Sequence, residues 1–378
     1  MEQSVQKGFF EQKLPSRLIL WSFPLLTLPL AGGLTLTSDH RFLFIYIWLF
    51  GLTHFVLTLS VYLQSENLKH FTESGRNILL FFAIPLTILM GFYVVGVFQL
   101  RVRFPAFAVV FSAAIRLLDF NHLNRQTFGV YQMFKARAGI RGTAGAKRVE
   151  QGYLATLTAL LFATYLAGGV YPLFRGKAAA IASAAHGKAG PVLLPIGALQ
   201  AVCVALTGVL VVLGAVSVSL AARAWRKAGR PAGLREALSY LGFQTAGVLL
   251  AVLSMPMYFA TLAIHYVEYH VLMFPRCFHS RLHEQSPVDR YFGRLRRRPA
   301  LFYGVVGIAA LVVLLFTNSS GMADSSTGYL AVVSIFDGLF VFHYFVETLI
   351  WRFSDPFFRR TLTSLYFQGA QARTPTAG

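Results

Sequence analysis

Ten stretches of about 20 mainly apolar residues, separated by short polar segments, constrain this fold more than any other feature. A helix of that length crosses the hydrocarbon core of a bilayer with all its backbone groups hydrogen-bonded internally. Only 13% of the 378 residues are charged, against about 25% in soluble domains. The sequence therefore predicts an all-α, polytopic integral membrane bundle. The predicted spans are residues 18–36, 41–63, 77–99, 104–122, 153–175, 192–222, 237–254, 257–275, 300–316 and 329–351.

The longest apolar run, residues 237–275, decides the orientation of the spans. It contains "SMPM" at 254–257, where Pro256 can end a helix. If the run is a tight hairpin, every strongly basic loop lies on the same side of the membrane as both termini. The positive-inside rule makes that side cytoplasmic. We therefore expect about ten transmembrane helices with cytoplasmic termini, in the bacterial inner (cytoplasmic) membrane.

The remaining composition fits the same class of protein. The formal net charge of +19 is carried by the loops between spans, so no nucleic-acid partner is expected. Residues 1–366 are predicted to form a single transmembrane helical domain. Residues 367–378 are predicted to be a disordered tail, and "LYFQG" at its start resembles the remnant of a protease-cleavable tag.

Several apolar stretches contain side chains that are expensive in a bilayer. An ionisable residue at the centre of a membrane helix costs about 2.5–3.5 kcal/mol on insertion scales, and such residues usually have a function. Four of the fifteen acidic residues and five of the ten histidines lie within or at the edge of the spans. They are Asp119, Glu268, Asp337, Glu347, His54, His122, His265, His270 and His343.

The spacing of these residues pairs carboxylates with imidazoles. Asp119 precedes His122 by three positions, Glu268 follows His265 by three, and Glu347 follows His343 by four. Residues three or four apart share one helical face, and Gln126 continues the stripe of the first pair. In the ten-span arrangement three of the histidines lie about 12–15 Å from the inner boundary. We expect the histidines to converge in one cavity in the inner half of the bilayer.

Several imidazoles with few carboxylates form a ligand set that suits iron, zinc or copper. The predicted ligands are His54, His122, His265 and His343. His270 is an alternative to His265, because residues five apart are about 140° apart on an ideal helix. Glu268 and Glu347 are predicted to act beside the ion, as additional ligands or as acceptors that orient the rings. Three further residues are predicted to support the ligands from outside: Asp119, Gln126 and Asp337.

Three motifs resemble those of a known family. "HYFVETLIWR" at His343–Arg352 resembles the pattern that closes the last helix of the bacterioopsin-related membrane β-carotene dioxygenases. "THFVLTL" around His54 and "HYVEYH" at 265–270 are similar to its other histidine motifs. The resemblance implies a helical membrane protein that holds one iron on histidines from several helices and cleaves a polyene with dioxygen. The family's His-Gly-Ala-Leu-Asp motif is absent from the first span, and His122 with "NRQTFGVY" is the candidate for its place.

The favoured interpretation is a non-haem Fe²⁺ oxygenase that acts on a lipophilic substrate, either a carotenoid-like polyene or another lipid, with zinc or copper as less favoured metals. Its expected partners are dioxygen, the substrate and membrane lipid. A transporter that relays protons or metal ions through the same side chains is the second interpretation. A haem protein with paired axial histidines is the third.

Overall fold

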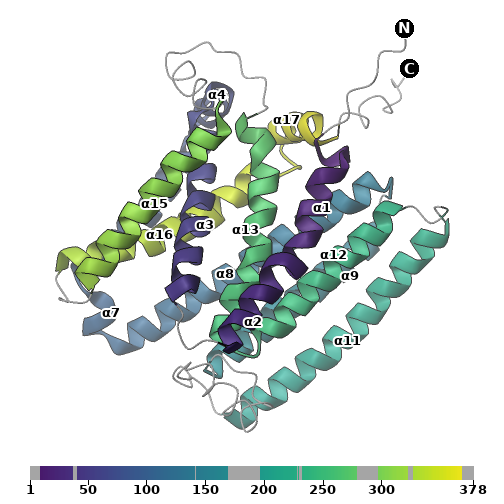
Figure 1. Ribbon diagram of the computed structural model, residues 1–378, viewed down its shortest axis with the longest axis horizontal. Helices are drawn as coiled ribbons and strands as arrows, with labels where there is room; N and C mark the ends of the chain where they lie inside the picture. Colours follow the sequence, from purple (N-terminus) through teal and green to yellow (C-terminus); the bar gives the residue numbers. More distant parts are fainter. Residues whose placement is uncertain are drawn as a thin grey trace. The chain divides into compact units, whose positions relative to one another are not determined.

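The structure is a computed structural model, and it describes residues 9–36, 41–140, 142–168, 196–227, 229, 232–278, 297–321 and 327–367. Within these ranges the regular structure is entirely helical, with no strand (Figure 1). The predicted all-α class is therefore confirmed for the described part of the chain. Each of the ten predicted spans overlaps one of its helices.

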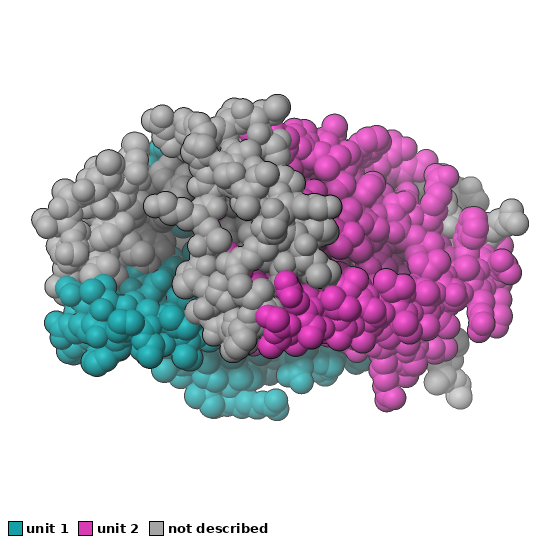
Figure 2. All heavy atoms as spheres, turned by 90° about the horizontal axis from the view of Figure 1, so that it is seen from below, with its two compact units in different colours: residues 1–9, 44–115, 269–378 teal, residues 10–43, 116–268 magenta. Residues whose placement is uncertain are grey.

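The chain is organised as two compact units (Figure 2). Unit 1 comprises residues 1–9, 44–115 and 269–378, and unit 2 comprises residues 10–43 and 116–268. The long helices α8 (Pro105–Arg137) and α13 (Met255–Phe278) contribute residues to both units, as does the start of α3 (Arg41–Leu59). The single domain predicted over residues 1–366 thus contains two separately packed groups of helices.

Unit 1 is centred on the packing of α6 against α16. Gly338 of α16 permits the close approach, because a Cβ atom built there would lie 2.9 Å from Cβ of Phe92 on α6. Besides parts of α8 and α13, the helices of this unit are α3 (Arg41–Leu59), α4 (Ser65–Thr72), α5 (Gly75–Ile78), α6 (Ile84–Val97), α7 (Leu100–Arg103), α15 (Pro299–Gly321), α16 (Thr327–Ile350) and α17 (Pro356–Tyr366). Short 3₁₀ and π turns extend α3 and join α5 to α6, at Ser60–Leu63 and Leu79–Ala83.

Unit 2 packs α11 along α9. Gly214 of α11 lies against the ring of Tyr153, whose Cε2 atom is 3.2 Å from a Cβ atom built at the glycine. At the far end of α8, Lys135 and Glu150 form a buried ion pair with Nζ and Oε1 2.6 Å apart. The other helices of the unit are α1 (Lys13–Ser22), α2 (Leu28–Leu36), α9 (Ala144–Leu166), α11 (Ile196–Lys227) and α12 (Ala232–Ala251), with a π turn at Phe23–Thr27 between α1 and α2.

The long apolar run at 237–275 forms two helices, as the sequence predicts. Helix α12 ends at Ala251 and α13 begins at Met255. The Ser254 side chain accepts a hydrogen bond from the backbone N–H of Met257 at 3.4 Å, which caps the start of α13. Pro256 is the second residue of α13. A backbone N–H in the first turn of a helix has no partner within the helix, so a proline at this position costs no hydrogen bond. The break thus precedes the proline.

Four helical segments of the described residues are long and apolar enough to cross a membrane: Lys13–Leu34, Gly75–Val97, Pro105–Arg137 and Gly197–Lys227. These segments are compatible with a polytopic integral membrane protein. The predicted span 104–122 forms only the first part of α8, which continues for 33 residues to Arg137. The added turns carry Gln126 and bury Tyr131 and Phe134 inside unit 2.

The predicted disordered tail lies outside the described ranges from residue 368 onward. Tyr366, inside "LYFQG", is described and is fully buried at the end of α17. Its hydroxyl donates a hydrogen bond to the carbonyl of Leu272.

Candidate metal centre

Two of the predicted ligands, His54 and His343, lie side by side in unit 1. His54 comes from α3 and His343 from α16, and their ring centroids are 4.2 Å apart in an edge-to-face arrangement. Both side chains are almost completely buried, with exposed fractions of 1% and 0%. The apolar neighbours of each helix therefore bring two imidazoles from distant parts of the sequence into one dry environment.

The ring of His343 is oriented by Thr58, one turn after His54 on α3. Thr58 Oγ1 lies 2.6 Å from Nδ1 of His343 and also contacts the hydroxyl of Tyr269. The carbonyl of His54 is an acceptor for the Thr58 hydroxyl at 3.4 Å. A hydroxyl donates one hydrogen bond and accepts two. When the Thr58 hydroxyl donates to the His54 carbonyl, it can accept from Nδ1–H of His343, and in that tautomer the lone pair of the ring is on Nε2.

Glu347 lies at the other nitrogen of the same ring. Its Oε2 atom is 3.4 Å from Nε2 of His343, and the residue is 6% exposed. The sequence predicts an acceptor that orients the ring or an additional ligand. The carboxylate therefore lies at Nε2, whereas Thr58 lies at Nδ1 of the same ring. This position is compatible with both predicted roles.

The other two predicted ligands form a second pair, in unit 2. His122 of α8 and His265 of α13 have ring centroids 5.0 Å apart, again edge to face. Their exposed fractions are 5% and 7%. Gln126, one turn after His122, donates a hydrogen bond from Nε2 to the carbonyl of His265 at 3.2 Å. The predicted supporting role of Gln126 thus has a defined contact, because its amide fastens α8 to the histidine turn of α13.

Glu268 is held by neutral hydrogen-bond donors beside the second pair. Gln126 donates to one carboxylate oxygen at 3.0 Å and Gln244 of α12 donates to the other. Tyr240 also lies next to this carboxylate, which is 1% exposed. A cavity of about 30 Å³ is lined by His265, Glu268 and Gln244, together with other residues of unit 2. A water molecule needs at least about 10–15 Å³ of such space, so this cavity can hold one.

The three other candidate residues have their described contacts elsewhere. Asp119 pairs with Arg116 at 3.1 Å and accepts a hydrogen bond from the hydroxyl of Tyr258. Asp337 pairs with Arg101 of α7, with Nη1 and Oδ2 2.6 Å apart. His270 is in contact with Phe50 and with Tyr303, whose hydroxyl is 3.5 Å from Nδ1.

No protein-family model, curated protein or solved structure matches this chain. What can be said of its chemistry therefore comes from the two histidine pairs and their surroundings. Each pair combines two buried imidazoles from different helices with a buried carboxylate one turn along the chain. This is a donor set for a transition metal ion.

Sequence reasoning did not find Thr58, Tyr269 or Gln244. For Thr58 a signal was present, because a hydroxyl four residues after His54 lies on the same helical face. The parts played by Tyr269 and Gln244 depend on contacts across the fold, with sequence separations of 211 from Thr58 and 24 from Glu268. The residue pattern within one helix cannot predict such contacts.

Proposed function

We propose that this protein is a membrane-embedded non-haem iron oxygenase that acts on a lipophilic substrate. One metal ion is held by the two histidine pairs together. The ligands in this proposal are His54, His122, His265 and His343.

The observation that carries the proposal is the chemistry of the donor set. In the described part of the chain, these four buried histidines are the group of side chains that could hold a metal ion. Neutral imidazoles suit iron, zinc and copper, and histidines combined with a carboxylate such as Glu347 are a ligand set of non-haem iron oxygenases. Buried imidazoles on membrane helices are energetically costly, and such residues usually have a function. Metal binding is a function that all four histidines can share.

The carboxylates give the site its means of moving protons. A bound ferrous ion would supply the activation of dioxygen. Glu347 lies beside Nε2 of His343, where it can take or return a proton at the ion. Glu268, with Gln126 and Gln244, adjoins a cavity with space for one water next to His265. A carboxylate, a water and an imidazole in this order form a short proton path on the side of unit 2.

The lipophilic substrate is proposed from the setting of the site. The ligands lie on helices whose other faces expose large apolar side chains, as at Val110 and Leu117 of α8. A polyene or another lipid can reach such a site from the bilayer without crossing water. The resemblance of "HYFVETLIWR" to the carotenoid dioxygenase motif favours a carotenoid-like polyene as the first substrate to test.

Metal analysis of variants tests the shared site most sharply. We expect the purified full chain to retain a single iron ion, and His54→Ala and His122→Ala each to lose it completely. His70→Ala is the matched control, because His70 is also buried but lies outside the histidine group. If each single variant kept half of the metal, the pairs would bind separate ions and the shared site would be wrong. A wild-type protein without tight metal would favour a transporter, and a Soret absorption band would favour haem.

A second measurement tests the reaction class. Iron-loaded protein should consume dioxygen when a carotenoid-like polyene is supplied in detergent, and the His343→Ala variant should not. If the loaded protein consumes no dioxygen with polyene or fatty-acyl substrates, the oxygenase assignment fails while the metal site stands.

A further inference from the structure

Unit 1 contains a cavity of about 270 Å³. Neither histidine of the pair in this unit lines it. It is formed where α5 begins and where the chain passes from α16 to α17. Its polar lining residues are Arg76, Asn77, Arg352, Ser354 and Asp355, and its apolar walls include Phe81 and Phe358. The volume is near the lower end of those that bind small ligands.

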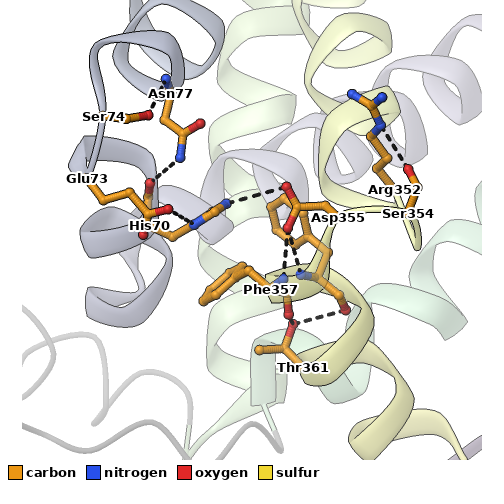
Figure 3. Close-up of polar contacts among 10 residues, drawn as sticks. His70, Glu73, Ser74, Asn77, Arg352, Ser354, Asp355, Phe357 and Thr361 are labelled. Atoms are coloured by element: carbon orange, nitrogen blue, oxygen red, sulfur yellow. Dashed lines mark hydrogen bonds and ion pairs between the residues drawn. The ribbon is translucent and has the colours of Figure 1, made fainter.

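Two guanidinium groups face this cavity with unused hydrogen-bonding capacity. Arg352 donates from Nε to Ser354 Oγ at 3.0 Å, which steadies the side chain and leaves its terminal nitrogens available (Figure 3). Among the described residues Arg76 forms no ion pair, and neither does Arg352. An arginine whose planar fork is open can bind two oxygens of one phosphate side by side.

The carboxylates near the cavity are occupied by other partners. Asp355 Oδ1 accepts hydrogen bonds from the backbone N–H groups of Phe357 and Phe358, at 2.8 and 3.4 Å, and so caps α17. Its Oδ2 atom lies 3.8 Å from Nε2 of His70, and Glu73 lies 3.1 Å from Nδ1 of the same ring (Figure 3). Asp355 lines the cavity as well, but its carboxylate is engaged by the start of α17 and by His70. Arg76 and Arg352 thus set two positive charges against one negative charge at the cavity.

The position of the cavity along the helices indicates the ligand. Arg76 is the second residue of Gly75–Val97, a segment long and apolar enough to cross a membrane. Arg352 follows the end of α16, the helix that packs along α6. Arginines at the end of a membrane helix lie at the depth of the phosphate groups of lipids. Helix α17 begins at Pro356, which lines the cavity, and it exposes two more arginines, Arg359 and Arg360.

We infer that this cavity binds a phosphate group between Arg76 and Arg352, with the headgroup of an anionic phospholipid as its source and free phosphate as the alternative source. The apolar walls next to the arginines suit the first acyl carbons of a lipid. This inference does not depend on the proposed metal site, since it uses none of its residues.

Lipid titration followed by native mass spectrometry tests the inference. Full-length protein in detergent is titrated with phosphatidylglycerol, for the wild type and for Arg76→Gln/Arg352→Gln. We expect the dissociation constant of the tightest lipid to rise about tenfold for each arginine lost, as for other charge-assisted hydrogen bonds. Arg359→Gln/Arg360→Gln is the matched control, which removes two exposed arginines of the same region and should change the constant less than twofold.

The source of the phosphate is distinguished in a second arm with inorganic phosphate. If only inorganic phosphate raises the thermal stability of the wild type, and the double variant abolishes this effect, a phosphate site exists and its ligand is soluble. If both variants weaken lipid binding equally, binding is a general surface attraction and the inference fails. Lipid and phosphate binding that are unchanged in Arg76→Gln/Arg352→Gln overturn it as well. Arg76→Lys/Arg352→Lys, which keeps the charge, should recover part of the affinity and shows that the cavity is still folded.

Discussion

Thr58 Oγ1 lies 2.6 Å from Nδ1 of His343, across a sequence separation of 285 residues. In the tautomer in which Nδ1 carries the proton, this hydroxyl accepts from the ring and leaves Nε2 for a metal ion. A metal-binding histidine generally donates its other N–H to such a group, and loss of the acceptor costs 10–100-fold in metal affinity. Substitution of Thr58 therefore tests the proposed metal site without removing a ligand.

Thr58→Val keeps the shape of the side chain and removes the acceptor. We expect iron affinity to fall about 10–100-fold, because the ring of His343 loses the partner that orients it. Competition with a chelator, followed by measurement of protein-bound iron, gives the affinity. Thr58→Ser is the control and should remain close to the wild type. Equal affinities of the valine and serine variants would show that Thr58 serves only packing.

Glu347→Gln separates metal retention from turnover. The amide has the same shape as the carboxylate but can neither hold nor return a proton. We expect the variant to bind iron more weakly and, when saturated with iron, to consume dioxygen far more slowly than the wild type. Iron content and dioxygen uptake are measured on the same sample. Normal uptake at full occupancy would assign Glu347 a structural role.

Gly338→Ala should destabilise unit 1. The added Cβ atom would lie 2.9 Å from Cβ of Phe92, in the packed contact between α16 and α6. Overpacking of this kind typically costs about 1–3 kcal/mol. Thermal unfolding in detergent measures the loss. Gly91→Ala on α6 is the control, because nothing lies within 4 Å of a Cβ atom built there, and a helical Gly→Ala change is then favourable by up to about 1 kcal/mol.

Two ion pairs of the structure, Lys135–Glu150 and Arg101–Asp337, should differ strongly in their contribution to stability. Lys135 and Glu150 are 6% and 8% exposed, so Lys135→Met leaves an uncompensated buried carboxylate, at a cost of about 3–5 kcal/mol. Lys135→Met/Glu150→Leu should recover most of that loss. Arg101 and Asp337 are 38% and 30% exposed, so Arg101→Gln should cost less than about 1 kcal/mol. Denaturant unfolding of the four proteins compares them, and similar losses for both single variants would contradict this ranking.

The positions of the helices could be predicted from the sequence because they depend on local apolar runs. The break between α12 and α13 is an example, since Ser254 and Pro256 are themselves local signals. The length of α8 could not be predicted in the same way. Its last turns are amphipathic, and only the tertiary packing that buries Tyr131 and Phe134 shows that they belong to the same helix.

The candidate site was predictable in its residue types but not in its contacts. The sequence indicates that His265 and His270 point in different directions, and the structure places His265 beside His122 and His270 beside Tyr303. Asp337 is predicted to support the ligands because it is acidic and lies in an apolar helix, and this role stays a prediction. Its ion pair with Arg101 spans 236 residues of sequence, and the periodicity of one helix cannot reveal a partner on another.

The contact of Gly338 with Phe92 also restricts how this sequence can diverge. The atom nearest to a side chain at position 338 is the Cβ atom of Phe92, at 2.9 Å, and every residue except glycine has this atom. A smaller residue at position 92 would remove the contacts with the ring at 3.1 and 3.4 Å but not this one. In descendants that keep this fold, position 338 should therefore remain glycine unless position 92 itself becomes glycine or the backbones of α6 and α16 move apart.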